Sequence, residues 1–73
     1  MLLVPVVSTD IAAAGYEPQT FEMQVQFTNG MIYSYAGVPP EVYDGFIIAP
    51  SKGSYFAQVF RRKPPTFPYT RIL

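Results

Sequence analysis

The amino-acid sequence predicts an α+β domain in which an antiparallel sheet packs against two short helices. Three observations carry this prediction. Residues 21–38 alternate apolar and polar side chains on both sides of Asn29 and Gly30, which is typical of a β-hairpin. Apolar residues recur at helical spacing in two later segments. Prolines separate these segments from each other and from the end of the chain.

The composition is that of one small domain. A chain of 73 residues buries only about 60% of its unfolded surface. Its content of 49% hydrophobic residues, with six Tyr and six Phe, supplies a large apolar surface for packing. Cysteine is absent, so no disulfide adds to stability. We predict a single domain over residues 1–73, with residues 64–73 as a proline-rich extended tail.

The N-terminal residues predict an edge strand or an extended arm, followed by one helical turn. Residues 1–8 contain Pro5, which lacks the N–H that an interior strand donates. Residues 8–10 (Ser-Thr-Asp) are suited to cap a short helical or 3₁₀ turn over residues 11–14. Gly15 is suited to end that turn.

The hairpin has a predicted register, with a two-residue type I′ loop at Asn29 and Gly30. Its pairs are Thr28 with Met31, Phe27 with Ile32, Gln26 with Tyr33, Val25 with Ser34, and Gln24 with Tyr35. Alternation then gathers apolar residues on a core face: Phe21, Met23, Val25, Phe27 and Ile32. Tyr33 and Tyr35 are expected on the opposite face, among Glu22, Gln24 and Gln26.

Two helices are predicted after the hairpin. The first begins at residues 39–40 (Pro-Pro) and ends before Pro50, and Gly45 is expected to weaken it by ~1 kcal/mol relative to Ala. The second runs roughly from Ser54 to Arg62, because residues 63–65 (Lys-Pro-Pro) cannot continue a helix. Beyond it, Phe67 and Tyr69 are candidate anchors of the extended tail.

The charges are divided along the chain although they sum to zero. All five acids precede position 45, and all five bases follow position 51. This division predicts either two charged poles or an internal network of ion pairs, and the alternative is that these are ordinary solvated charges. The acids are Asp10, Glu17, Glu22, Glu41 and Asp44, and the bases are Lys52, Arg61, Arg62, Lys63 and Arg71.

No reaction is predicted. Histidine and cysteine are both absent, which removes the usual general base, nucleophile and transition-metal ligands. Glu41 and Asp44 fall in the first turns of a predicted helix, where the macrodipole favours acids. No Gly-rich loop precedes a helix at phosphate-binding spacing. We therefore expect no catalytic residue, no cofactor and no metal.

Two surfaces are candidates for partner binding. The first is the hairpin face with Tyr33, Tyr35, Gln24 and Gln26, because aromatic rings beside amides stack on bases or anchor a protein. The alternative is that the N-terminal segment, the helices or the tail covers those rings. The second is a basic C-terminal cluster, which would contact phosphates or an acidic protein patch: Arg61, Arg62, Lys63 and Arg71. The alternative there is a solvated helix end.

An ordered series of residues resembles the KTSC domain, a short family found at the C-terminus of some lysyl-tRNA synthetases and as stand-alone bacterial and phage proteins. The resemblance covers about residues 6–72, and Pro64-Pro65 departs from a typical member. It implies a small α+β domain without catalysis, and RNA binding has been suggested for the family. The series is Ser8, Ile11, Gly15, Tyr16, Phe27, Asn29, Gly30, Tyr33, Ser34, Tyr35, Val38, Pro39, Val42, Tyr43, Ala49, Ser51, Gly53, Tyr55 and Phe56.

The length and the free-standing domain also resemble a small bacteriophage regulator that binds host RNA polymerase. The leading expectation is therefore a non-enzymatic regulator that binds a subunit of bacterial RNA polymerase and inhibits or modulates transcription. The alternative is an RNA-binding accessory module that uses Tyr33, Tyr35 and the basic cluster, and the third possibility is a purely structural domain.

The N-terminus has no basic signal-peptide region and no stretch approaches ~20 apolar residues, so we expect a cytoplasmic protein that contacts no membrane. We also expect a monomer.

Overall fold

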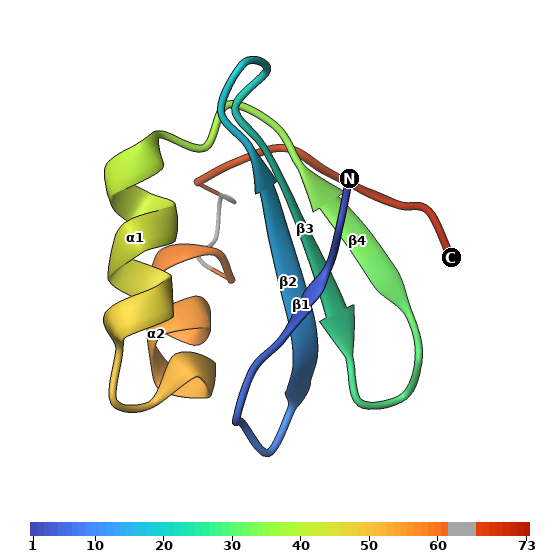
Figure 1. The fold of residues 1–73 in the computed structure, drawn as a ribbon, viewed down its shortest axis with the longest axis vertical. Coiled ribbons are helices and arrows are strands. Elements are labelled where there is room, and N and C mark those ends of the chain that lie inside the picture. Colours follow the sequence, from blue (N-terminus) through green and yellow to red (C-terminus); the bar gives the residue numbers. More distant parts are fainter. Residues whose placement is uncertain (62–65) are drawn as a thin grey trace.

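The computed structural model describes residues 1–61 and 66–73, which form a sheet with two helices against one of its faces (Figure 1). Within these residues the strands are β1 (Val4–Pro5), β2 (Ile11–Glu17), β3 (Glu22–Phe27), β4 (Ile32–Tyr35) and β5 (Tyr69–Arg71), and the helices are α1 (Pro40–Ile48) and α2 (Lys52–Val59). The sheet is antiparallel with the order β1-β2-β3-β4-β5. The predicted α+β class is confirmed.

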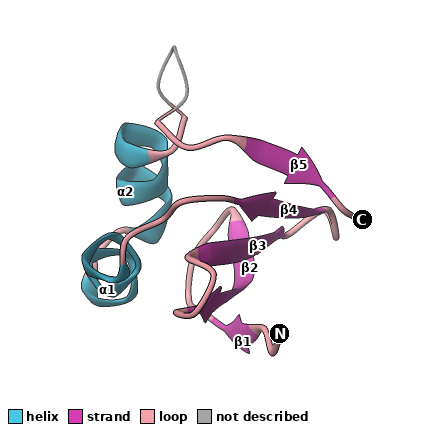
Figure 2. Ribbon diagram, turned by 90° about the horizontal axis from the view of Figure 1, so that it is seen from above, coloured by secondary structure: helices cyan, strands magenta, loops and turns pink. Residues whose placement is uncertain are grey.

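Both helices lie on the same side of the sheet, which we call the inner face, while both chain ends lie toward the outer face (Figure 2). The predicted first helix is confirmed, with Pro40 at its start. The second begins earlier than predicted, at Lys52, because the Ser51 hydroxyl accepts a hydrogen bond from the Ser54 N–H and caps it. No helix of the described residues is long and apolar enough to cross a membrane.

The predicted helical turn over residues 11–14 is wrong, because these residues belong to strand β2. The Ser8 hydroxyl accepts from the N–H groups of Asp10 and Ile11 at 3.4 Å each, so it closes a turn before the strand and caps no helix. Pairing with β1 on one side and β3 on the other satisfies the backbone instead. Gly15 is required here because a Cβ would come 2.5 Å from the Leu2 carbonyl oxygen.

The hairpin register also differs from the prediction, by one residue. The Phe27 N–H donates to the Met31 carbonyl at 2.9 Å, which leaves residues 28–30 as a three-residue loop. Gly30 has φ +91°, the left-handed conformation that ends such a loop. The pairs are Gln26 with Ile32, Val25 with Tyr33, Gln24 with Ser34, and Met23 with Tyr35.

The slip moves several side chains to other faces than predicted. Tyr33 and Tyr35 point to the inner face, and Ile32 joins Gln24 on the outer face. Phe21, which was expected in the core, lies in the turn before β3 with φ 60° and is exposed. The sequence could not distinguish the two registers, because Asn29 and Gly30 suit a two-residue and a three-residue loop alike.

The core between sheet and helices is aromatic. Its largest fully buried side chains are Phe46, Phe56, Phe60, Ile11, Met23, Val25 and Val38. Tyr35 stands edge-on to the rings of Phe56 and Phe60, with centroids at 5.5 and 5.1 Å. Edge-to-face pairs at such distances add to the free energy of burial. Packing of this kind stabilises a domain that has no disulfide.

The C-terminal residues complete the sheet. β5 pairs with β4 along Tyr33–Arg71, Ser34–Thr70 and Tyr35–Tyr69. Phe67 packs on Phe60 with ring centroids 5.3 Å apart. The segment expected as an extended tail is therefore docked from Phe67 onward, with both candidate anchors in use.

Gly45 on α1 faces Tyr55 of α2 and provides a test of the fold. A Cβ at this position would lie 2.5 Å from the Tyr55 hydroxyl oxygen, which donates to the Val42 carbonyl at 2.8 Å. Overpacking costs ~1–3 kcal/mol and alanine gains ~1 kcal/mol of helix propensity, so Gly45→Ala should lower the free energy of unfolding by up to roughly 2 kcal/mol. Urea denaturation checks this value.

The matched control is the same substitution in a Tyr55→Phe background, where the hydroxyl is gone and the loss should shrink. A Gly45→Ala variant that is more stable than the parent would contradict this account of the helix contact.

Candidate functional site

The inner face of the sheet is only partly covered where β4 meets β5. Side chains from β3, β4, β5 and the end of α2 gather at this place. We call this surface the aromatic–arginine edge, and its residues are Phe27, Tyr33, Tyr69, Arg61 and Arg71. Phe27 and Tyr33 are half-buried, and the other three are exposed.

The aromatic rings of the edge form a continuous row. Phe27 and Tyr33 meet edge-on with centroids 5.7 Å apart, and Tyr33 and Tyr69 lie 5.8 Å apart at a tilt of 45°. Tyr69 keeps 54% of its surface exposed. Because Tyr33 lies on β4 and Tyr69 on β5, the row depends on the docking of the C-terminal strand.

Arg61 lies directly after α2, and its guanidinium covers the row from one side. The guanidinium carbon lies 5.1 Å from the centroid of Phe27 and 5.3 Å from that of Phe56. Such cation–π contacts hold the charged group in place while its edge stays in water. The guanidinium is thereby positioned over the rings and remains open to an anion.

Arg71 supplies the second guanidinium of the edge. It pairs with Tyr33 across β4 and β5, so the two side chains lie on the same face of the sheet. Its Nε donates to the Leu73 carbonyl at 3.3 Å. This contact leaves the other guanidinium nitrogens as donors, which suits a phosphate or a carboxylate.

Tyr35 lies beneath the edge and is no part of its surface. Only 5% of its side chain is exposed. Burial raises the pKa of Tyr35 to about 12, although the charge of Arg61 acts in the opposite direction. Its phenol is therefore protonated at neutral pH and has no role as a base there.

The structure brings together three of the predicted site residues: Tyr33, Arg61 and Arg71. The predicted surface of tyrosines beside glutamines is wrong, because Gln24 and Gln26 lie on the outer face and Tyr35 is in the core. The predictions for Arg62 and Lys63 fall outside the described residues.

Sequence reasoning missed Phe27 and Tyr69 as members of the site. Phe27 was assigned to the core and Tyr69 to a tail anchor. The alternation of Tyr69 and Arg71 around Thr70 is the only pattern that indicates a strand with both side chains on one face.

The outer face carries a carboxylate with a structural role. Glu22 Oε2 accepts from the Ser34 hydroxyl at 2.6 Å and from Gln24 Nε2 at 2.9 Å. These hydrogen bonds, that from Ser34 first, hold the pKa of Glu22 below its usual value. The described residues contain no group of three acids that could hold a metal ion.

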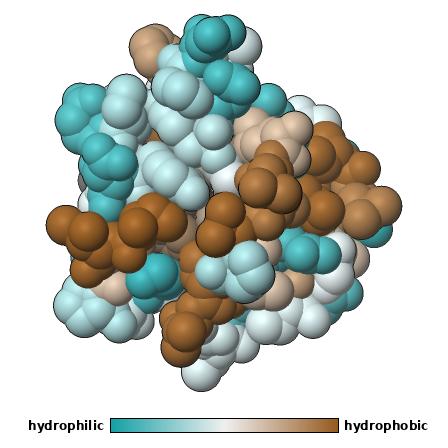
Figure 3. Space-filling model, in the orientation of Figure 1, coloured by the Kyte–Doolittle hydropathy of each residue, from teal (hydrophilic) through white to brown (hydrophobic). Residues whose placement is uncertain are grey.

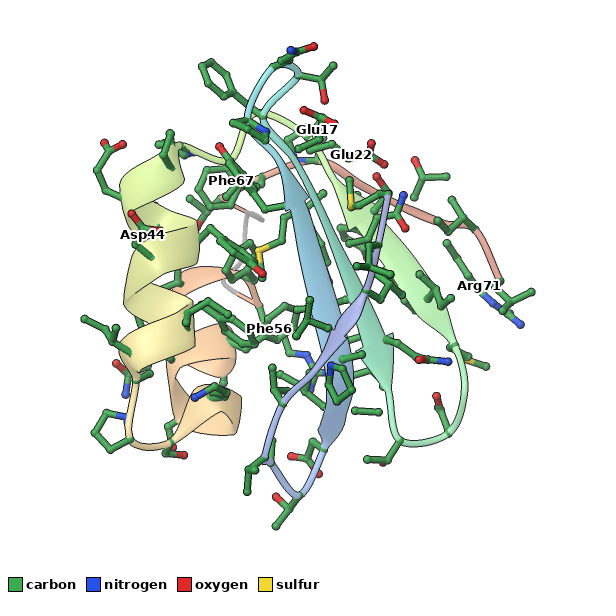
Figure 4. The ribbon with its side chains drawn as sticks, viewed as in Figure 1. Glu17, Glu22, Asp44, Phe56, Phe67 and Arg71 are labelled. Carbon is green, nitrogen blue, oxygen red and sulfur yellow. The ribbon has the colours of Figure 1, made fainter. Side chains whose placement is uncertain are left out.

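The acids of α1 lie far from the two arginines of the aromatic–arginine edge. Figure 4 shows Asp44 on α1 and Arg71 beyond β4, on opposite sides of the molecule. Glu41 is also exposed on α1, whereas Arg61 and Arg71 lie at the aromatic–arginine edge. The two guanidinium groups leave the edge locally basic in a chain without net charge.

Comparison with known proteins gives consistent matches. The family model of the KTSC domain matches residues 7–63. A protein of Stutzerimonas stutzeri is 39% identical over 99% of both chains. A lysine–tRNA ligase of Nostoc punctiforme is 38% identical over 66% of this chain, and the match covers only 9% of that ligase. The crystal structure of a KTSC domain protein from Yersinia pestis superimposes with a TM-score of 0.87 at 34% identity, covering 99% of this chain and 97% of the other.

The burial of Tyr35 predicts a pH dependence of stability. Between pH 10 and 12 the phenol ionises in the unfolded chain but stays protonated in the folded one. The unfolded state therefore binds fewer protons, and the free energy of unfolding should fall with rising pH by ~2–3 kcal/mol over that window. Below pH 10 this contribution is constant. Urea titrations across the window measure it.

Tyr35→Phe should remove this part of the dependence, whereas Tyr69→Phe, at an exposed position, should retain it. Equal slopes for wild type and Tyr35→Phe would show that Tyr35 is not buried as described.

Proposed function

The chain belongs to the KTSC domain family, and from that premise we propose that it is a non-enzymatic binding module that takes single-stranded RNA on the aromatic–arginine edge. The observation that carries the proposal is the row of three aromatic rings with a guanidinium at each side, on a surface that is partly open. Bases stack on aromatic and guanidinium faces, and guanidinium groups contact phosphates.

The geometry suits a flexible single strand better than a duplex. Tyr69 presents an exposed ring face for a base, while Tyr33 is half-buried and supports it from below. Arg61 and Arg71 flank the rings as donors for the backbone of the strand. Stacking of this kind tolerates any sequence because every base has a π-face.

A relative supports RNA as the ligand class. The Nostoc punctiforme protein is named as a lysine–tRNA ligase, and a segment that spans 9% of it matches this chain. The domain thus occurs within a protein whose name includes an RNA.

The two guanidinium groups of the edge predict a moderate affinity for single-stranded RNA that depends on salt. Two guanidinium groups at the edge correspond to about two phosphate contacts, so log K should fall with log salt at a slope of roughly −1.4 for a single strand. The aromatic–arginine edge, as defined above, contains no carboxylate or histidine beside its two guanidinium groups. We therefore propose binding without catalysis.

The second candidate function is regulation of bacterial transcription by binding a subunit of RNA polymerase. It is favoured by exposed apolar side chains near both chain ends, among them Leu2, Val4 and Leu73. Figure 3 shows this brown surface on the face that carries the N-terminal arm and the C-terminal end. Contiguous exposed apolar surface marks protein interaction sites. It lies on the outer side, away from the helices.

Removal of the exposed ring tests the RNA proposal. Tyr69→Ala should weaken binding of a fluorescently labelled oligouridylate by ~1–3 kcal/mol, because one stacking platform is lost. Fluorescence anisotropy measures the affinity. Gln24→Ala is the matched control and should bind as the wild type does, since Gln24 lies on the outer face.

The salt dependence tests the same proposal independently. Arg61→Gln and Arg71→Gln should each reduce the salt slope by about 0.7, since each removes one phosphate contact. An affinity that ignores salt, or a Gln24→Ala variant as weak as Tyr69→Ala, would sink the proposal.

The polymerase candidate predicts a different set of sensitive residues. Purified bacterial RNA polymerase should bind the labelled protein in a titration, and Leu2→Asp with Leu73→Asp should abolish that binding because charges would enter an apolar contact. Tyr69→Ala should leave it unchanged. If no titratable complex forms, the polymerase candidate is rejected while the RNA proposal still stands on its own measurements.

A further inference from the structure

One edge of the sheet is open to a further strand. The Ala36 N–H donates to the Pro68 carbonyl and the Ile72 N–H to the Ile32 carbonyl, both at 2.9 Å. Backbone groups alternate in direction along a strand, so those of Tyr69 and Arg71 point away from β4. Figure 2 shows β5 at the end of the sheet, with no described strand beyond it.

The other edge does not offer the same opportunity. β1 consists of Val4 and Pro5 only, and Pro5 has no N–H to donate. Natural sheets protect their edges with short strands and prolines of this kind. β5 is also short, with three residues, but none of them is a proline, so Tyr69 and Arg71 keep their outward N–H groups.

The open edge of the sheet also carries exposed apolar side chains beside Arg71 and Thr70. Tyr69, Ile72 and Leu73 have 54%, 49% and 65% of their surfaces exposed. Unpaired backbone groups beside exposed apolar side chains form a template for strand pairing. Pro68 does not interfere, because position 68 belongs to the set that faces β4.

We propose that β5 pairs with β5 of a second copy of this chain, antiparallel about a two-fold axis at Thr70, and joins the two sheets into one. This axis places Tyr69 opposite Arg71 of the second copy. Both residues have outward backbone groups, so each such pair exchanges two hydrogen bonds. The arginine and the tyrosine of each pair can also form a cation–π contact.

The neighbouring registers are less favourable. An axis at Arg71 would place two guanidinium groups directly opposite each other, and like charges in that position are destabilising. An axis at Tyr69 would place Arg71 opposite Phe67, which precedes β5 and already packs on Phe60 in the core. The axis at Thr70 uses both outward-facing residues and also brings Pro68 opposite Ile72 on the outer face.

The dimer extends the aromatic–arginine edge. A two-fold axis perpendicular to the sheet keeps both inner faces on the same side, so the two edges adjoin and form one longer surface. The pairing does not depend on what that surface binds. One short strand of each copy buries less than the ~1,200 Å² of stable complexes, so the dimer should dissociate in the micromolar range or above.

Charge variants at the axis test the proposal. Thr70 is exposed and would face its own copy across the axis. In sedimentation velocity from micromolar to millimolar protein without RNA, wild type should show a monomer–dimer equilibrium. Thr70→Lys and Thr70→Glu should each weaken it by up to about five-fold, because like charges then face each other. An equal mixture of the two variants should restore dimerisation.

Thr20→Lys and Thr20→Glu are the matched controls, since Thr20 is exposed in the turn before β3. They should behave as the wild type does, alone and mixed. A mixture of the Thr70 variants that dimerises no better than either alone would overturn the proposed axis.

A measurement on the unchanged protein keeps the proposal testable if the variants fold poorly. Amide hydrogen exchange of Tyr69 and Arg71 should slow as the protein concentration rises, while that of Thr70, which faces β4, should not change. A wild-type protein that stays monomeric at millimolar concentration, with exchange independent of concentration, would refute the proposal.

Discussion

The left-handed conformation of Gly30 is the constraint on which the rest of the structure depends. It closes a three-residue loop and sets the register of β3 against β4. Because side chains alternate with a period of two, that register decides which face every residue of β4 takes. Tyr33 and Tyr35 consequently face the helices, where the core needs large apolar groups.

The same register connects the core to the candidate site. Tyr35 fills the space against Phe56 and Phe60, and Tyr33, two residues earlier, reaches the open part of the same face. β5 then docks on β4 and adds Tyr69 to the row. The proposed binding surface is thus the exposed continuation of the aromatic core, and disruption of β5 would affect both.

The distribution of charge makes the aromatic–arginine edge locally basic. A chain with zero net charge has little long-range attraction for nucleic acid. The fold nevertheless collects Arg61 and Arg71 beside the rings and leaves Asp44 on the far side. Local recognition by stacking and short-range contacts is therefore a better account of the edge than electrostatic steering.

The sequence by itself determined the two helices and the hairpin, because these elements depend on residues that are close together in the chain. Prolines and helical spacing predicted both helices, and Asn29 and Gly30 predicted the hairpin. The family resemblance rested on the same residues. Each of these inferences depends on neighbours in the chain, which a sequence displays directly.

The tertiary structure alone decided what depends on distant partners. Residues 11–17 form a strand because β1 and β3 pair with them, although residues 8–15 have the pattern of a capped turn. Arg61 belongs to the site because α2 ends over Phe27, far away in sequence. Tyr69 and Arg71 join it because the C-terminal residues pair with β4. Strand pairing and ring contacts join residues that are far apart in the sequence, so the sequence does not display them. Two-residue and three-residue loops around Asn29 and Gly30 also have nearly the same sequence pattern.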